Sequence, residues 1–325
     1  MYKVAIIGCG WVGLAHASGY KNIEECQIVG AADTEKILSE KLVTKYGGNS
    51  YESIKDLLEK EKPDIVSVCT PPSSHRPVIQ TALSRGVQFI LCEKPLAQTV
   101  EQAREIVSAT RENGAILMTA FCHRFIEPVQ EIKKMLRLGD LGDPIFFRNE
   151  FSSKFRGVDA RWFSKPEISG GGAMMDTSIH SVDLFRYLCG EVKSVSARTI
   201  SRIPALRVED SSCLLLQSED GCIGIIEASW NVGVGNALLE IVGTEGRAVY
   251  EYWGNLKVRI QTDDSWQTIP IRRDINRRFE DELRHFIKVI KSEVNQYPSA
   301  EDGLRANIVI DAAYRSVKEN AWIFV

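Results

Sequence analysis

The sequence predicts an α/β protein in two parts: a doubly wound parallel sheet, followed by an α+β domain with a large, mostly antiparallel sheet. Three observations support this prediction. Short apolar runs alternate with helical patterns over residues 1–121. A Gly-x-Gly-x-x-Gly stretch lies between the first apolar run and the first helical pattern. From residue 192 to residue 271, strand-like segments follow one another with only turns between them.

The first part reads as strands buried on both faces and connected by crossover helices, which is typical of a parallel sheet with helices on each side. The apolar runs are residues 4–7, 27–32, 65–69, 87–92 and 116–120. The helical patterns between and after them are residues 12–20, 35–46, 54–58, 77–84 and 100–111. We therefore expect a first domain over residues 1–121.

The pattern changes after Phe121, and we expect a second domain over residues 122–325. A helix is predicted over residues 129–138, and another over 173–188 after the glycine-rich stretch Ser169-Gly170-Gly171-Gly172. The clearest strands are residues 214–216, 223–226, 238–242 and 248–252. Consecutive strands without helices between them favour antiparallel pairing. Two helices are expected to close the chain.

Composition excludes several classes of protein. The formal net charge is −3 and charged residues of both signs are interspersed, so neither nucleic acid nor a membrane surface is an expected partner. We see no targeting segment and no apolar run long enough to span a bilayer, and we expect a cytoplasmic protein. The eight cysteines form no C-x-x-C pair and mostly lie in apolar runs, as small buried hydrophobes in a reducing compartment do. A Cys213–Cys222 disulfide is disfavoured for that reason.

The stretch Gly8-Cys9-Gly10-Trp11-Val12-Gly13 predicts a dinucleotide site because it follows a strand and opens a helix. Gly8 permits the tight turn, Gly10 lets the backbone approach a pyrophosphate, and Gly13 allows close helix–strand packing. The helix start at Trp11 and Val12 offers free N–H groups to phosphates. The alternative is that the three glycines only serve a tight turn.

Asp33 ends the second apolar run, twenty residues after Gly13. A carboxylate there can accept hydrogen bonds from the adenosine ribose hydroxyls and would repel a 2′-phosphate. We therefore expect NAD rather than NADP, although Lys36 is near enough in the sequence to weaken that repulsion. The alternative is that Asp33 caps the following helix.

Two further strand ends are predicted to face the ligand, because ligands bind beyond the carboxyl ends of the strands in such sheets. They are Cys69-Thr70-Pro71-Pro72 and Cys92-Glu93-Lys94-Pro95. A half-buried Lys94 could donate a hydrogen bond or a proton to a substrate hydroxyl. The following proline makes a fixed turn, with a cis bond as one option. The alternative is a surface lysine paired with Glu93.

Asp176, His180 and Asp183 are spaced to lie along one face of the predicted helix 173–188. Polar residues on one stripe of an otherwise apolar helix suggest a wet cleft beneath it. A neutral histidine can take a proton from a sugar hydroxyl while a carboxylate orients it. The alternative is a helix with satisfied structural polar groups.

Glu93-Lys94-Pro95, together with the glycine-rich stretch leading to Asp176 and His180, resembles the glucose–fructose oxidoreductase, inositol dehydrogenase and rhizopine-catabolism family. The resemblance covers essentially the whole chain. It implies a Rossmann domain, and a second domain with an open sheet whose outer face is commonly used for oligomerisation. A homodimer or homotetramer is therefore expected.

The resemblance also implies roles for individual residues. Lys94 would bind and polarise the reacting group, His180 would act as general acid and base, and Asp176 would orient the substrate. Matches to segments beside the cofactor or substrate are Thr70, Pro71, His75, Glu93, Arg124 and Trp162.

From these features we expect an NAD-dependent dehydrogenase or reductase acting on a secondary hydroxyl or ketone of a sugar, cyclitol or sugar derivative. No metal is expected. One alternative is a glycosidase or lyase that oxidises its sugar transiently with NAD. The other is a non-catalytic dinucleotide sensor. His16 is expected to be a packed polar residue, and the basic run 271–278 is expected to be a solvated helix entry rather than a phosphate site.

Overall fold

A computed structural model describes residues 1–252, 254–271, 274–295 and 297–325. The described chain divides into two compact units. The first comprises Met1–Cys122 with Asn276–Asn307, and the second comprises His123–Ile275 with Ile308–Val325. Arg272 and Arg273 of the basic run 271–278 lie outside the described residues.

The first unit contains a six-stranded sheet in the order β3-β2-β1-β4-β5-β6, and every strand pair in it is parallel. The strands are β1 (Tyr2–Ile7), β2 (Cys26–Ala32), β3 (Asn49–Tyr51), β4 (Ile65–Val68), β5 (Phe89–Glu93) and β6 (Ile116–Ala120). All four residues of β4 are buried, as expected for a strand covered on both faces. The predicted doubly wound parallel sheet is confirmed.

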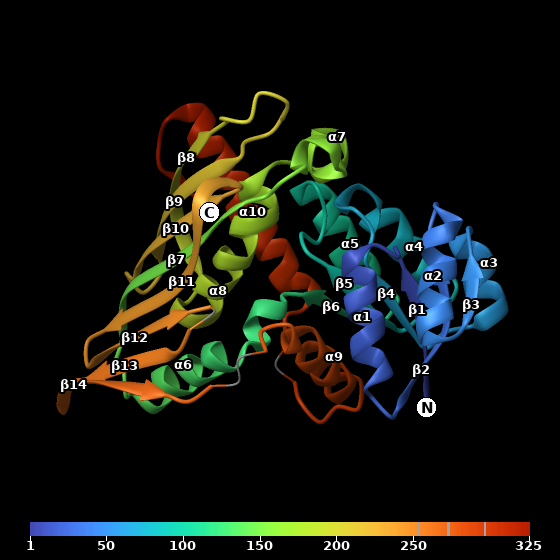
Figure 1. Ribbon diagram of the computed structural model, residues 1–325, viewed down its shortest axis with the longest axis horizontal. Coiled ribbons are helices and arrows are strands. Elements are labelled where there is room, and N and C mark those ends of the chain that lie inside the picture. Colours follow the sequence, from blue (N-terminus) through green and yellow to red (C-terminus); the bar gives the residue numbers. More distant parts are fainter. Residues whose placement is uncertain (253, 272–273, 296) are drawn as a thin grey trace. The chain divides into compact units, whose positions relative to one another are not determined.

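Helices connect these strands and cover the sheet (Figure 1). They are α1 (Trp11–Lys21), α2 (Lys36–Tyr46), α3 (Ile54–Glu61), α4 (His75–Ser84) and α5 (Val100–Glu112), with a short 3-10 turn, η1 (Pro72–Ser74), before α4. Helix α1 contacts α2, whereas α4 contacts α3 and α5. Strand order reverses between β1 and β4, so the loops after these two strands lie side by side.

Helix α9 (Arg277–Ile290) belongs to the first unit, whereas the sequence placed all of 122–325 in the second domain. Its apolar face packs on α1. A Cβ on Gly19 would lie only 2.5 Å from the side chain of Leu283, and the rings of Trp11 and Phe279 meet edge to face. The beginning of α10 (Ala300–Glu319) also lies in this unit, where the Asn307 side chain donates to Ala97 O.

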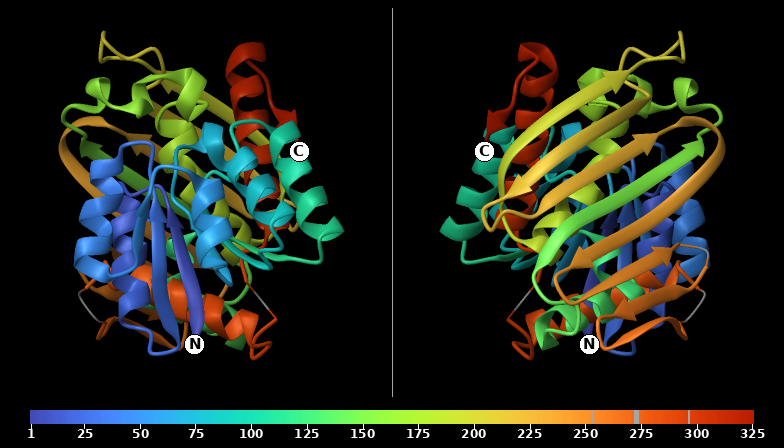
Figure 2. Two further views of the ribbon diagram at one scale, coloured as in Figure 1. Left: turned by 90° about the vertical axis from the view of Figure 1, so that its right-hand side faces the viewer. Right: turned by 90° about the vertical axis from the view of Figure 1, so that its left-hand side faces the viewer.

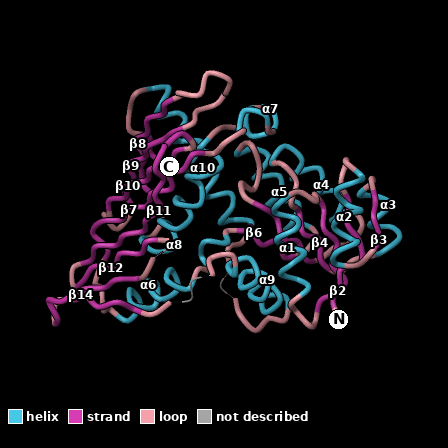
Figure 3. Tube along the Cα trace, in the orientation of Figure 1, coloured by secondary structure: helices cyan, strands magenta, loops and turns pink. Residues whose placement is uncertain are grey.

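The second unit contains a nine-stranded sheet in the order β14-β13-β12-β11-β7-β10-β9-β8-β15. Its strands are β7 (Pro144–Lys154), β8 (Val192–Ile200), β9 (Ser211–Ser218), β10 (Ile223–Ser229), β11 (Asn231–Gly243), β12 (Gly246–Glu251), β13 (Leu256–Ile260), β14 (Asp263–Ile269) and β15 (Ile323–Phe324). Only β7 and β10 pair in parallel, and the other neighbours are antiparallel. The predicted mostly antiparallel sheet is confirmed. Helices separate β7 from β8 and β14 from β15, whereas β8 to β14 follow one another with no helix among the described residues between them (Figure 3).

The helical segments of the second unit include α6 (Glu127–Leu138), the four-residue α7 (Pro166–Ser169), α8 (Ile179–Cys189) and the end of α10. Helix α8 lies on one face of the sheet, where Phe185 meets Phe147 of β7 edge to face. The opposite face carries no helix among the described residues of this unit (Figure 2, right). Along β9, buried Leu214 and Leu216 alternate with exposed Cys213 and Leu215.

All eight cysteines are free thiols, with Cys213 exposed and Cys222 buried. Among the described residues, no helix combines the length and the apolar character needed to cross a membrane.

Candidate active site

The glycine loop between β1 and α1 has the backbone geometry that its sequence predicts. Gly8 has φ +91°, and a Cβ there would lie 2.6 Å from the carbonyl of Cys69. A Cβ on Gly13 would lie 2.1 Å from Gly8 O, so only glycine lets α1 pack so close to the loop. Gly10, in contrast, has no neighbouring atom within 4 Å of a Cβ position. The space beside Gly10 is therefore open to a ligand.

Helix α1 begins beside that open space with uncompensated N–H groups. Its N-cap is Gly10, which offers no side-chain acceptor, and its first turn contains no acidic residue. Trp11, the first helical residue, is 66% exposed. The backbone N–H groups of Trp11, Val12 and Gly13 have no acceptor within the helix, and the positive end of the helix dipole favours an anion. The loop therefore fits a pyrophosphate.

Asp33 ties the end of β2 to the glycine loop. Its Oδ2 accepts from Cys9 N at 2.7 Å, and its Oδ1 accepts from Glu35 N at 2.9 Å. Asp33 is not the N-cap of α2, which is Glu35, although its bond to Glu35 N holds the chain that enters this helix. Its role in ligand binding stays a prediction. Each carboxylate oxygen has a second lone pair, so the half-buried side chain retains acceptors for ribose hydroxyls. These residues fit a dinucleotide with an unmodified ribose.

His75 links the turns that follow β4 and β5. Its Nε2 lies 2.8 Å from Thr70 O and its Nδ1 lies 2.9 Å from Pro95 O, and the ring is fully buried. Both oxygens only accept, so a neutral ring donates to one of them at a time. The Thr70 Oγ1 atom is buried and has no hydrogen-bond partner among the described residues. The loop containing Thr70 and Pro71 therefore carries one orphaned polar group that a ligand could satisfy.

Stability should depend on pH through His75, because burial lowers the pKa of its imidazole. Below about pH 6.5 the unfolded chain takes up a proton that the folded chain resists, so stability is full above that pH and declines as pH falls towards the lowered folded pKa. We expect the free energy of unfolding to fall by up to about 1.4 kcal/mol per pH unit from this group. Urea unfolding of the wild type and of His75→Gln should give curves that converge at acid pH. Parallel curves would contradict the expectation.

Glu93 is the last residue of β5 and Lys94 follows it, and a buried histidine holds Glu93. His16 Nε2 lies 3.0 Å from Glu93 Oε1, and His16 Nδ1 lies 2.8 Å from Ser67 Oγ. A carboxylate only accepts, so Nε2 is the donor and Nδ1 accepts from Ser67 in a neutral ring. Lys94 is half-buried, and its peptide bond to Pro95 is cis. His16 is packed as predicted, but its contact with Glu93 could not be foreseen.

Asp176 and His180 lie in the second unit, on consecutive helical segments. Asp176 belongs to a π-helical turn, η5 (Met174–Ser178), and His180 is in the first turn of α8. Trp230 Nε1 donates to Thr177 Oγ1 at 3.0 Å, and Thr177 donates to Asp176 Oδ2 at 3.3 Å. This chain holds the half-buried carboxylate in place. A π-turn instead of regular α-helix is a feature that often marks functional sites.

Asp183 does not face a wet cleft, which corrects the interpretation of the polar stripe. Asp183 is 1% exposed. The Arg124 guanidinium donates a hydrogen bond to each of its two carboxylate oxygens. Arg124 Nε lies 2.8 Å from Oδ2, and its second nitrogen lies 2.6 Å from Oδ1. Arg124 is itself 6% exposed and lies over the ring of Tyr187. This geometry favours a structural role for Arg124 over the substrate contact expected of it.

Breaking this pair should strongly destabilise the protein, because the remaining charge would stay buried. We expect Asp183→Ala to lower the free energy of unfolding by about 3 kcal/mol or more. Adding Arg124→Ala should cost much less than a second loss of that size. The exposed Arg207–Glu167 pair is the control, and Glu167→Gln should leave the free energy of unfolding nearly unchanged. Additive losses in the double variant, measured by urea unfolding, would argue against a coupled pair.

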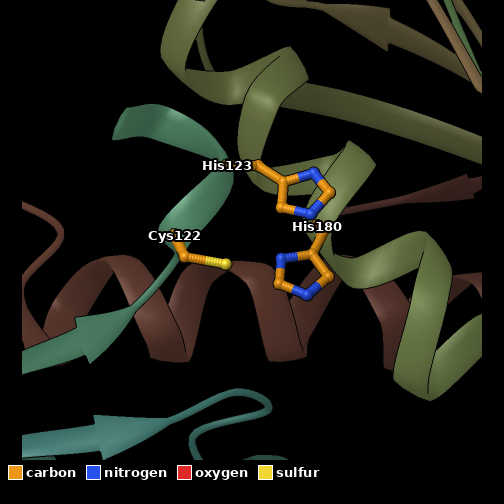
Figure 4. A group of neighbouring side chains, drawn as sticks. All are labelled: Cys122, His123 and His180. Carbon is orange, nitrogen blue, oxygen red and sulfur yellow. The ribbon is translucent and has the colours of Figure 1, made fainter. Parts of the chain in front are cut away.

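His123 is a site residue that the sequence analysis did not single out. It belongs to the 3-10 turn η2 (Cys122–Phe125), and its ring stacks on that of His180 with centroids 4.3 Å apart and planes 15° from parallel. Figure 4 shows the two rings one above the other, with the Cys122 sulfur nearby. One ligand atom from each of the three side chains lies within 4.8 Å of the others.

This group is poorly arranged for a metal ion. The lone pair of an imidazole nitrogen lies in the plane of its ring, so nearly parallel stacked rings direct their lone pairs side by side and not towards one point. The stack instead fixes the orientation of the His180 ring. Phe151 also contacts His123, edge to face, with the two ring centroids 5.0 Å apart. No signal in the sequence indicates the stack, because the two histidines are 57 positions apart.

Trp162 forms part of an aromatic cluster near the glycine-rich stretch. It lies in the 3-10 turn η4 (Trp162–Ser164), which follows η3 (Val158–Ala160), and stacks on Phe163 at 3.8 Å. Phe163 in turn meets Trp230, which supports Asp176 through Thr177. Trp162 is half-buried, so part of its ring remains available for contact.

The strand order of the first unit, with the glycine loop at the reversal of that order, defines a dinucleotide-binding Rossmann domain. A family model described as "Oxidoreductase family, NAD-binding Rossmann fold" matches residues 2–121. A second, described as "GFO/IDH/MocA C-terminal domain", matches residues 129–249. The chain belongs to this GFO/IDH/MocA family of NAD-binding oxidoreductases, as its motifs predict.

Similar proteins include several dehydrogenases of sugars and cyclitols. D-glucoside 3-dehydrogenase of Escherichia coli (strain K12) is 29% identical, with 97% of this chain and 95% of the relative covered. Inositol 2-dehydrogenase of Rhizobium meliloti (strain 1021) is 26% identical, with 99% of each covered. Among solved structures, levoglucosan dehydrogenase in complex with NADH and levoglucosan superposes with a TM-score of 0.93 at 25% identity, covering 100% of this chain and 99% of that one.

Proposed function

We propose that the protein is an NAD-dependent dehydrogenase or reductase that acts on a secondary hydroxyl, or the corresponding ketone, of a sugar, cyclitol or sugar derivative. The observation that carries the proposal is the presence in one chain of a dinucleotide loop and two sets of proton-handling side chains. The loop is Gly8–Gly13, and the two sets are Glu93 with Lys94 and Asp176 with His180. The sugar and cyclitol dehydrogenases among the relatives support this substrate class.

The cofactor is held in this proposal by the first unit. The N–H groups at the start of α1 bind the pyrophosphate, and Asp33 accepts from the ribose hydroxyls. Thr70, Pro71 and His75 form or support the wall beside the nicotinamide, with the buried Thr70 hydroxyl available to it. Bound NAD supplies the acceptor for the hydride that leaves the substrate carbon.

The protein's own side chains manage the proton and the charge on oxygen. His180 takes the proton of the substrate hydroxyl, and in reduction it returns that proton. The Lys94 ammonium stabilises the developing alkoxide, a charge that a preorganised cation meets without rearrangement. Asp176, held by Thr177 and Trp230, accepts a hydrogen bond from the substrate and fixes its orientation. His123 keeps the His180 ring in place.

A substrate screen tests this function. Inositols, free hexoses, glycosides and nucleotide sugars are each mixed with NAD at alkaline pH, and NADH is followed by absorbance. The proposal expects NADH with at least one polyol class. Turnover of a glycoside with tightly retained cofactor and no net NADH would favour the transient-oxidation chemistry instead. Binding of NAD without NADH from any compound would favour a sensor.

Asp33 should set the preference for NAD over NADP. Asp33→Asn retains an oxygen acceptor but removes the charge that disfavours a 2′-phosphate and strengthens the ribose bonds. We expect the ratio of kcat/KM with NAD to kcat/KM with NADP to fall at least about tenfold, in keeping with the strength of charge-assisted hydrogen bonds. Asp56→Asn, at an exposed residue of α3, is the matched control. An unchanged ratio would remove Asp33 from this role.

We also propose that copies of the chain associate through the face of the nine-stranded sheet opposite α8, as a homodimer or homotetramer. Exposed apolar side chains meet across neighbouring strands there: Phe146 pairs with Ile223, and Leu215 pairs with Ile225. Apolar side chains clustered on an open sheet face favour a protein partner. Light scattering of the purified protein should give a dimer or larger assembly, whereas a monomer at micromolar concentration would contradict the proposal.

A further inference from the structure

Glu209 is a carboxylate that the mechanism above leaves unused. It lies just before β9, and one of its oxygens, Oε1, accepts three hydrogen bonds. The donors are Gly172 N at 2.9 Å, Met174 N at 3.0 Å and the Tyr314 hydroxyl at 2.8 Å. The Glu209 backbone carbonyl accepts a fourth, from Ala173 N at 2.9 Å. One residue thus binds three consecutive N–H groups of the chain that opens the π-turn η5.

The glycine-rich stretch is shaped to fit this contact. A Cβ on Gly172 would lie 1.9 Å from Glu209 O, and a Cβ on Gly171 would lie 2.0 Å from the Tyr314 hydroxyl. Neither position has room for a side chain while Glu209 and Tyr314 are in place. The two glycines therefore let the backbone approach Glu209 and Tyr314 closely. Neither glycine has a positive φ, so this close approach, and not backbone conformation, is what requires glycine here.

The segment held in this way leads directly to the proton-transfer residues. Met174 is the first residue of η5, Asp176 is its third, and α8 with His180 follows without a break. The N–H groups at a helix start carry a partial positive charge, so an ionised carboxylate is the strongest acceptor that could be placed there. A shift or rotation at Gly172 would propagate to Asp176, because the π-turn begins at Met174, the last of the anchored residues.

We infer that Glu209, supported by Tyr314, is a positioning residue that anchors the start of η5 and so sets the places of Asp176 and His180. The inference rests on the proposed function, in which those two residues touch the substrate. Glu209 itself does not reach the reacting atoms in this account. The anchor, the glycine-rich stretch and both proton-handling residues all belong to the second unit.

The test compares Glu209→Gln, Glu209→Ala and Tyr314→Phe with Glu167→Gln, the same change at an exposed glutamate of the same unit. The first readout is hydrogen exchange of the peptide spanning residues 170–180. Charge-assisted bonds contribute enough that Glu209→Gln should speed exchange at Gly172 and Met174 about tenfold. Tyr314→Phe leaves both backbone bonds in place and should give a smaller increase, and Glu167→Gln should give none.

The second readout is kinetics on the substrate found in the screen. We expect kcat to fall about tenfold in Glu209→Gln and further in Glu209→Ala, with the dissociation constant for NAD unchanged in both. A smaller loss of kcat in Glu209→Gln than in Glu209→Ala would show that glutamine keeps part of the positioning. A general loss of the fold would not produce that difference. If Glu209→Ala does not fold, exchange and kcat are measured in Glu209→Gln and Tyr314→Phe alone.

Several results would overturn the inference. They are unchanged exchange in Glu209→Gln, faster exchange with unchanged kcat, and an equal loss of kcat in Glu167→Gln. Failure of the proposed function looks different, because the wild type itself would then bind NAD and form no NADH. The exchange experiment would still report on the anchor in that case.

Discussion

Lys94→Ala is expected to lower kcat/KM by roughly 10²–10³-fold, the usual consequence of removing one preorganised group that stabilises charge on oxygen in a transition state. Lys94 is half-buried at the end of β5, and its backbone N–H is held by the Glu93 carboxylate at 3.2 Å. This contact holds the backbone of Lys94, and in the proposed mechanism the side-chain ammonium meets the developing alkoxide charge. The loss should fall mainly on kcat, because the alkoxide charge develops only in the transition state.

Two further variants make the Lys94 prediction specific. Lys94→Arg keeps the charge but changes the shape of the donor, and it should recover only part of the activity. Lys41→Ala, at an exposed residue of α2, should leave kcat/KM unchanged. A Lys94→Ala enzyme with near-normal rates and intact NAD binding would remove Lys94 from the mechanism.

His180→Ala is expected to lower kcat by roughly 10²–10⁴-fold, the range for loss of a general acid or base. Its ring is stacked on His123 and carried by the first turn of α8, so the proton acceptor is held in one orientation. Added imidazole should restore part of the rate, because a small base can occupy the vacated space. The control is His285→Ala in α9 of the first unit, which should retain activity.

The His123 stack provides a second check on this assignment. His123→Phe keeps a flat ring against His180, whereas His123→Ala removes the stack. We expect the alanine variant to lose more activity than the phenylalanine variant, because orientation of His180 is the property that the stack supplies. A His180→Ala enzyme with a wild-type kcat would contradict the role given to His180, whatever the His123 variants do.

Much of the fold could be predicted because the relevant signals are local. The apolar runs and the Gly8–Gly13 loop gave the parallel sheet, and consecutive strands after residue 192 gave the second sheet. The placement of α9 could not be predicted in the same way. Its apolar face is visible in the sequence, but the surface that covers that face is α1, more than 250 positions away. Amphipathic periodicity shows that a helix has a buried side and does not show what buries it.

The same distinction between local and tertiary signals explains which residues of the candidate site could be predicted. Residue types and spacing pointed to Asp33, Lys94, Asp176 and His180, whose chemistry is readable from one short segment each. Arg124 was expected to touch substrate, but its partner Asp183 lies 59 positions away and no local pattern reveals a buried ion pair. The contacts of His16 with Glu93, of His123 with His180, of Glu209 with Gly172 and Met174 and of Trp230 with Thr177 are all tertiary. The sequence therefore points to candidate ligand-binding residues more readily than to the residues that hold them.

The most direct test of net hydride transfer uses the substrate found in the screen, labelled with deuterium on the carbon that bears the reacting hydroxyl. The account predicts that one deuterium appears on the nicotinamide of released NADH for each ketone formed, with slower turnover than for the unlabelled compound. Label that stays with or returns to the carbohydrate product, without release of deuterated NADH, would contradict it.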